Sequence, residues 1–118
     1  RFALYGGSRV DVRRGAARRA DAFNEQPMAL SFFPSGDGEL PAVPLTLTGD
    51  TVQMTAFKAA EDGNGYIVRL FNPQPTAASV TLTADGHTCE VAFGKFEIVS
   101  LRLTGDGFVP CNLIEEAL

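Results

Sequence analysis

Few residues of this chain have the types and spacing that catalysis needs. His87 is the single histidine among 118 residues, and it stands in the turn sequence Asp-Gly-His-Thr. Any Ser-His-Asp or Cys-His device would have to use it, but nothing nearby in the sequence supports one. The pattern therefore predicts an exposed turn histidine rather than a catalytic base.

Metal and cofactor patterns are also missing. Cys89 and Cys111 match no zinc-ligand spacing. Asp62-x-Asn64 resembles the start of a calcium loop, but Ile67 and Pro73 stand where that loop needs glycine at its sixth position and glutamate at its twelfth. No glycine-rich phosphate loop is present. We predict no catalytic residue, no metal site and no cofactor in this segment.

A cluster of charged residues opens the stretch KAAEDGNGYIVRLFNP, residues 58–73. Lys58, Glu61 and Asp62 precede a tight Gly-Asn-Gly turn, and Arg69 interrupts the apolar run YIVRLF. A strand that is apolar on both sides is expected to be covered on both faces, and an unpaired buried charge costs several kcal/mol. Arg69 is therefore predicted to pair with a carboxylate, and the candidates are Glu61, Glu97 and Glu115.

Short strands separated by turn signals make up most of the chain. Hydrophobic residues are 45% and charged residues 20% of the sequence, as in an ordinary globular domain. With no helices between them, such strands predict an all-β fold, an antiparallel β-sandwich. Strands are expected at 28–33, 45–48, 51–57, 66–71, 79–84, 88–93 and 96–103.

Side-chain alternation assigns faces to several of these strands. Val80 and Leu82 should face the core, as should Cys89, Val91 and Phe93. In FEIVSLRL, residues 96–103, the apolar positions change phase between Ile98 and Val99. A β-bulge near these two residues would absorb the extra residue.

The first 19 residues carry six arginines and one aspartate, and the rest of the chain is acidic. Asp11 is predicted to cap a helix that Pro27 ends. Val12, Ala16, Ala20 and Phe23 would form its apolar stripe, and the solvated faces would carry Arg13, Arg14, Arg18 and Arg19. Nucleic-acid binding through these arginines is the weaker alternative, because no aromatic residue lies between Tyr5 and Phe23.

Location and partners are constrained by what the composition lacks. No apolar run approaches the length of a membrane-spanning helix, so no membrane contact is expected. Two reduced, buried cysteines and the absence of an Asn-x-Ser/Thr sequon predict a cytoplasmic protein. The chain starts at Arg1 without Met, as a fragment or processed piece would.

Several segments, taken in order, resemble the C-terminal end of the α-mannosidases of glycoside hydrolase family 38. That end typically reads as Asn-x-Pro after a helix, then "TALKKAEDG", "IVRLYN", "PFEIKTLRL" and "NLLEE". Two departures lie in loops: Gly6-Gly7 replaces a Pro-His, and Gly94-Lys95 stands where proline is common. The segments that carry the resemblance are AFNEQP (22–27), TAFKAAEDG (55–63), YIVRLFNP (66–73), FEIVSLRL (96–103) and NLIEE (112–116).

The resemblance implies that catalysis and structural support belong to different regions of the parent enzyme. The zinc site and the nucleophile of the retaining reaction on α-mannosides belong to an N-terminal catalytic region in that family. This chain, residues 1–118, would then be a single C-terminal β-sandwich domain, with a leading strand and helix in 1–27 and sandwich strands in 28–118. It would pack on and support the catalytic region. The structural or interdomain candidates are Lys58, Glu61, Arg69, Asn72, Asn112 and Glu115.

Partners implied by the resemblance are the other domains of the parent enzyme, with homo-oligomerisation through the parent left open and no nucleic acid. A second class of function stays open, an independent carbohydrate-binding or protein-docking module, since fold does not fix function. Sugar-binding modules usually stack sugars on exposed aromatic rings. This chain has no Trp, and its tyrosines are Tyr5 and Tyr66.

Overall fold

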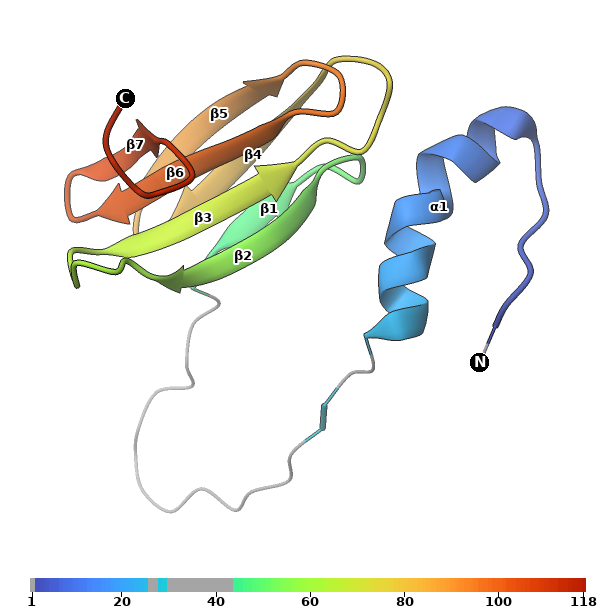
Figure 1. Cartoon of the computed structure of the whole chain (residues 1–118), viewed down its shortest axis with the longest axis horizontal. Helices are drawn as coiled ribbons and strands as arrows, with labels where there is room; N and C mark the ends of the chain where they lie inside the picture. Colours follow the sequence, from blue (N-terminus) through green and yellow to red (C-terminus); the bar gives the residue numbers. More distant parts are fainter. Residues whose placement is uncertain (1, 26–27, 30–43) are drawn as a thin grey trace.

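The computed structural model describes residues 2–25, 28–29 and 44–118. Its elements follow the order of one helix and then seven strands (Figure 1). These are α1 (Arg9–Asn24), β1 (Thr46–Thr48), β2 (Gln53–Ala59), β3 (Tyr66–Phe71), β4 (Ala78–Ala84), β5 (His87–Phe93), β6 (Ile98–Thr104) and β7 (Gly107–Cys111).

The strands form two antiparallel sheets packed face to face. One sheet has three strands in the order β1-β4-β5, and the other has four in the order β2-β3-β6-β7. Figure 1 shows the three-stranded sheet lying behind the four-stranded one. The predicted all-β, antiparallel sandwich with one short N-terminal helix is confirmed.

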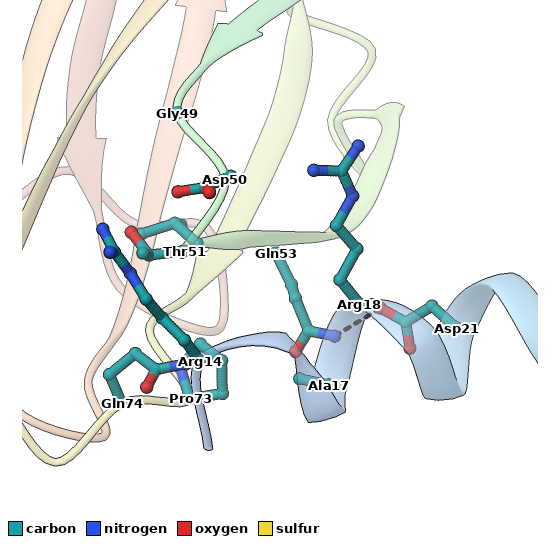
Figure 2. Close-up of a pocket in the computed structure, with 11 residues that line it drawn as sticks. Arg14, Ala17, Arg18, Asp21, Gly49, Asp50, Thr51, Gln53, Pro73 and Gln74 are labelled. Atoms are coloured by element: carbon teal, nitrogen blue, oxygen red, sulfur yellow. Dashed lines mark hydrogen bonds between the residues drawn. The ribbon is translucent and has the colours of Figure 1, made fainter. Parts of the chain in front are cut away.

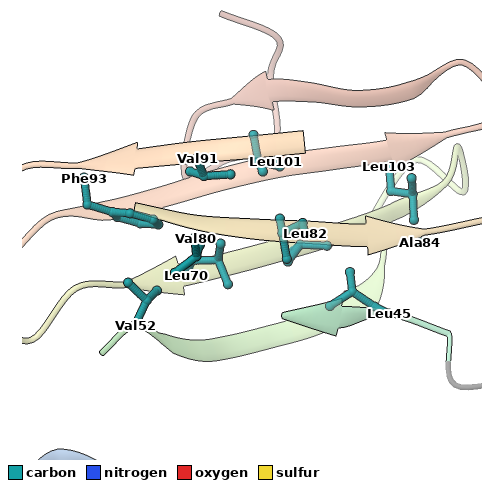
Figure 3. Close-up of a cluster of buried hydrophobic side chains, with 11 residues drawn as sticks. Leu45, Val52, Leu70, Val80, Leu82, Ala84, Val91, Phe93, Leu101 and Leu103 are labelled. Atoms are coloured by element: carbon teal, nitrogen blue, oxygen red, sulfur yellow. The ribbon is translucent and has the colours of Figure 1, made fainter. Parts of the chain in front are cut away.

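The core fills the space between the sheets. Figure 3 shows Leu70, Leu82 and Leu101 pointing into it from β3, β4 and β6. The predicted alternation is confirmed: Val80, Leu82, Val91 and Phe93 are buried, and Cys89 packs against them half-buried. The alternation of apolar and polar residues along the sequence therefore predicted the inward faces of β4 and β5 correctly.

The largest differences from the sequence prediction lie at the starts of β2 and β6 and at β7. β2 begins at Gln53, two residues later than expected, and β6 begins at Ile98 rather than at Phe96. β7 was not predicted, because Gly107 and Pro110 are both unfavourable in strands. β7 tolerates Pro110 because it is an edge strand, where a missing N–H costs no ladder bond on the open side.

The bulge predicted near Ile98 and Val99 is wrong. These residues pair with Phe71 and Leu70 in unbroken register. The apolar phase changes because Phe96 lies in the preceding turn with φ of 52°, outside the strand. An irregularity does occur in β2, where the register shifts between Met54 and Ala56.

Helix α1 begins one turn earlier than Asp11, which is not its cap. Ser8 is the N-cap: its hydroxyl accepts a hydrogen bond from the Asp11 N–H at 3.2 Å and donates one to the Asp11 carboxylate at 2.6 Å. The hydroxyl thus satisfies one of the free N–H groups at the helix start, as an N-cap side chain does, and the Asp11 carboxylate bonds the same hydroxyl. The helix ends at Asn24, before Pro27 as expected.

Two expected strands near α1 are not found among the described residues. Residues 2–7, where the leading strand was expected, form no strand, and neither do Met28 and Ala29. The rest of the strand expected at 28–33 lies outside the described residues.

Helix α1 stands beside the sandwich and buries none of its side chains (Figure 1). Gln53 at the start of β2 donates a hydrogen bond to Asp21, and Arg14 and Arg18 line the hollow between helix and sandwich (Figure 2). The predicted apolar stripe instead lines a groove with Ala3 and Tyr5. All four arginines assigned to solvated faces are exposed. In the part of the chain that the structure describes, no helix is long and apolar enough to cross a membrane.

Replacement of a side chain in this core should destabilise the sandwich strongly. Leu82 is fully buried, so Leu82→Ala removes apolar contacts and leaves a cavity. We expect the free energy of unfolding to fall by about 2–5 kcal/mol in urea titrations. Leu118→Ala, at a leucine that is 85% exposed, is the matched control and should change it by less than about 0.5 kcal/mol. Equal effects of the two changes would contradict this placement of the core.

Candidate functional site

The outer face of the four-stranded sheet is covered by the C-terminal segment, residues 112–118. Val68 and Leu70 of β3 point into the sandwich, so Ile67 and Arg69 point outward. Ile67 is nevertheless fully buried, where it packs with Ala60 and Cys111 in a second small apolar cluster. β3 is thus buried on both faces, as its sequence predicted. Figure 1 shows the C-terminal segment in front of β6 and β7, and Arg69 of β3 reaches it by a hydrogen bond.

Arg69 fastens this segment through neutral acceptors, not through a carboxylate. Its Nε donates to Ser100 Oγ at 3.1 Å on β6, and its Nη2 donates to the Leu113 carbonyl at 3.0 Å. The predicted ion pair with Glu61, Glu97 or Glu115 is not among the ion pairs of the described residues. Two neutral oxygens therefore hold the half-buried guanidinium, one from a side chain and one from the backbone.

Arg102 makes a parallel set of contacts one strand over. Its Nη2 donates to the Glu115 carbonyl at 2.8 Å, and its Nη1 bonds both carboxylate oxygens of Asp62 at 2.8 Å. Nη1 also reaches the Asn64 carbonyl at 3.0 Å. One guanidinium therefore joins the β2–β3 turn to the C-terminal segment, and the Asp62 pKa is lowered chiefly by this hydrogen-bonded arginine.

Glu115 anchors the same segment by its side chain. Its carboxylate accepts from the Glu61 backbone N–H at 2.8 Å and pairs with Lys58 Nζ at 2.8 Å. Lys58 also pairs with Glu61. Glu115 is buried and holds a φ of 71°, a left-handed conformation that costs free energy for a residue with a Cβ. The contacts of its carboxylate with the Glu61 N–H and with Lys58 maintain this conformation.

These contacts fix the protonation states of the cluster. The backbone N–H of Glu61 and then Lys58 lower the pKa of Glu115, while Glu115 and then Glu61 raise the pKa of Lys58. Lys58 and Glu115 are thereby held charged around neutral pH. A general acid or base needs a pKa near the working pH, so this arrangement is suited to fastening the segment and not to proton transfer.

Asn112 shapes the segment where it leaves β7. Its Oδ1 accepts from the N–H groups of Ile114 and Glu116 at 3.0 and 2.9 Å, and its Nδ2 donates to the Glu116 carboxylate at 3.0 Å. An asparagine that bonds the backbone two residues ahead closes a turn without help from a helix or strand. The chain then runs back along β7, where Ala117 bridges to Cys111.

Asn72 lies apart from this cluster, in the loop after β3. It is fully buried, and its Nδ2 donates to the carbonyls of Thr76 and Gly94 at 2.8 and 2.7 Å. Its Oδ1 accepts from the Gln74 N–H at 3.0 Å. Asn72 therefore ties the β3–β4 loop to the β5–β6 loop.

The six candidate residues thus occupy two places. Five of them gather around the C-terminal segment, namely Lys58, Glu61, Arg69, Asn112 and Glu115. Sequence reasoning omitted Arg102 and Asp62, which belong to the same cluster. Arg102 alternates with apolar Leu101 and Leu103, the same signal that singled out Arg69.

The remaining reactive residues form no constellation. His87 opens β5 half-buried rather than standing exposed in the turn, and its Nε2 lies 3.1 Å from the Gly105 carbonyl. Cys89 and Cys111 are free thiols; Cys111 is buried as predicted, and burial raises the pKa of its thiol. No group of three His, Cys, Asp or Glu residues that could hold a metal occurs among the described residues.

The loop role of Asn72 is testable by Asn72→Asp. This change places a carboxylate oxygen against two carbonyl oxygens, so its pKa in the folded state should rise above the unfolded value. Near neutral pH the variant should lose more than about 3 kcal/mol of unfolding free energy, and it should regain stability as the pH falls and the carboxyl protonates. Asn64→Asp, on an exposed turn, should change stability by less than about 0.5 kcal/mol at either pH. A pH-independent loss would count against the two carbonyl contacts.

Acid should weaken the wild-type domain partly through Glu115. A lowered folded pKa contributes stability above the ordinary value of 4.5, and the contribution disappears as the pH falls through the folded pKa. Glu115→Gln should therefore lower the urea midpoint at about pH 7 and make it fall less on going to about pH 3.

The matched control for this change is Glu90→Gln, at an exposed glutamate on β5. It should retain the acid dependence of the wild type. If Glu115→Gln and Glu90→Gln give the same pH profile, the ion cluster does not stabilise the fold.

Comparisons with known proteins agree with this architecture. The family model described as "Glycosyl hydrolases family 38 C-terminal beta sandwich domain" matches residues 51–118, which is more than half of the chain and covers β2 to β7. Neither the curated proteins nor the solved structures give a significant match. The chain therefore belongs to the family of glycosyl hydrolase family 38 C-terminal β-sandwich domains.

Proposed function

We propose that this chain is a non-catalytic domain of a zinc-dependent, retaining α-mannosidase, and that it packs on the catalytic region and supports it. The family membership supports a place in a glycoside hydrolase. The α-mannoside substrate and the zinc ion come from the sequence resemblance, and both belong to the catalytic region of the parent enzyme. The retaining reaction would use a pair of carboxylates there.

The observation that carries the supporting role is an ordered apolar surface on the C-terminal segment. Leu113 and Ile114 are 59% and 74% exposed, and Leu118 is exposed as well. The backbone beneath them is held by Arg69, Arg102 and the Asn112 turn described above. Exposed apolar side chains on a rigid backbone are typical of a surface that another domain covers.

Neighbouring strands extend this surface. Ile98 at the start of β6 and Val109 on β7 are 51% and 42% exposed. Register places Val109 opposite Arg102, on the outer face of the four-stranded sheet, the same face that the C-terminal segment covers. Docking of another domain here would bury apolar area that is now in water, at about 25 cal/mol per Å².

A cytoplasmic location for the parent enzyme also remains our proposal. Its support is the pair of unbridged cysteines at positions 89 and 111, since disulfides are rare in reducing compartments.

A charged substitution on this surface should distinguish loss of domain docking in the full-length parent from unfolding of the domain itself. Ile114→Asp should lower the thermal stability of the parent by more than about 1 kcal/mol and reduce its turnover of an aryl α-mannoside with zinc present. The same change in the isolated chain should leave the urea midpoint nearly unchanged, because the side chain is exposed there. The isolated chain should show no turnover.

Ala92→Asp is the control, an exposed position on the outer face of the other sheet. It should leave both the parent and the isolated chain unaffected. Zinc-dependent turnover by the isolated chain would refute the non-catalytic role, and an unaffected Ile114→Asp parent would refute the docking surface.

A further inference from the structure

A hollow of about 390 Å³ opens at the end of the sandwich where three hairpin turns meet. Gly65 comes from the β2–β3 turn, Asp85 from the β4–β5 turn and Gly105 from the β6–β7 turn. Its volume is within the range of pockets that hold small molecules. The other lining residues are Pro44, Phe57, Tyr66, Leu103 and Thr104.

Two stacked aromatic rings form one wall of the hollow. The ring centroids of Phe57 and Tyr66 are 5.4 Å apart, with 26° between the ring planes. Phe57 pairs with Val68 in register, so it belongs to the inner face of its sheet. Both rings are nonetheless accessible, Phe57 at 37% and Tyr66 at 51%, whereas inward residues further along β3 are buried.

The short strand β1 explains this exposure. β1 has three residues and begins at Thr46, while β2 continues to Ala59 on the facing sheet. In the part of the chain that the structure describes, no strand of the three-stranded sheet extends over the two rings. An aromatic pair at a core position is thus presented to solvent at the open end of the sandwich.

The Asp85 carboxylate lies on the rim of the hollow with no positively charged residue beside it among those that the structure describes. No hydrogen bond or ion pair joins the Asp85 carboxylate to another described residue, and no lysine or arginine lines the hollow. Asp85 and Gly86 both have positive φ, 48° and 76°, as in the tight two-residue turns of hairpins. The carboxylate is therefore carried on a short, well-defined turn.

The opposite rim is equally constrained. At Gly65, with φ of 86°, a Cβ would lie 2.2 Å from the Leu103 carbonyl oxygen. Only glycine permits this close approach of the β2–β3 turn to β6. The positions of Tyr66 and Leu103 in the wall are set by that contact.

We propose that this hollow binds a neutral pyranose sugar. One face of such a ring is lined with C–H groups, which would lie on the aromatic wall, and its hydroxyl groups would donate to the Asp85 carboxylate. The unpaired carboxylate disfavours anions. Membership in a glycosyl hydrolase family makes a sugar the ligand to expect near this domain. The site lies apart from the C-terminal docking surface, so either proposal can fail without the other.

The test is an NMR titration of the whole isotope-labelled chain with mannobiose, cellobiose and, as a cationic probe, choline. We expect saturable shifts with at least one disaccharide, in the millimolar range of a small open site. The shifted amides should be those of the three turns, with Gly65, Tyr66, Asp85 and Gly105 among them. Choline should give no saturable shift there.

Variants identify the groups that bind. Tyr66→Ala should weaken binding by about tenfold, because it removes the stacking surface, whereas Tyr66→Phe should retain most of the affinity. Asp85→Asn should weaken binding severalfold, since a neutral amide is the poorer acceptor. Tyr5→Ala is the matched control, because Tyr5 is 46% exposed but lies outside this hollow, and it should leave affinity unchanged.

Three results would overturn the proposal. They are the absence of a saturable shift with either disaccharide in a well-dispersed spectrum, binding that survives Tyr66→Ala, and shifts confined to residues outside the three turns. Saturation by choline alone would assign the hollow to a cation instead. If Tyr66→Ala fails to fold, the Asp85→Asn and Tyr66→Phe titrations still decide the matter.

Discussion

Strand β3 must be covered on both of its faces, and the rest of the structure is organised around that requirement. Val68 and Leu70 are buried against the three-stranded sheet, and Ile67 is buried on the other side. A sandwich of two sheets covers only the inner face. The outer cover comes from residues 112–118. Hydrogen bonds from Arg69 on β3 and Arg102 on β6 hold this segment against the sheet.

The charged residues serve this fastening. Arg69 and Arg102 each donate to a backbone carbonyl of the segment, while Lys58 holds the Glu115 side chain. Arg102 also pairs with the Asp62 carboxylate, whereas Arg69 is held by two neutral oxygens. Such a network holds the segment at several points at once, which favours a rigid surface. In a catalytic site, one group usually retains a pKa near neutrality and access to substrate.

The sandwich presents two surfaces of different chemical character. The C-terminal segment presents aliphatic side chains on a fixed backbone, which suits burial by another domain. The open end of the sandwich presents Tyr66 and Phe57 beside Asp85, which suits a ligand with an apolar face and hydroxyl groups. Helix α1 contributes to neither surface, because its contacts with the sandwich are few and polar. The region matched by the family excludes it as well.

The sequence by itself determined the class of fold, the inward faces of β4 and β5, and the two-sided burial of β3, because these depend on periodicity and turn residues that act locally. It also indicated the family, through the order of its segments. Strand β7, the register shift in β2 and the partners of Arg69 were decided by the tertiary structure. The physical reason is distance along the chain: Arg69 meets Leu113, 44 residues away, only after both sheets have formed. Local patterns show that a buried charge needs a partner, but the packing of the sheets decides which oxygen lies within reach.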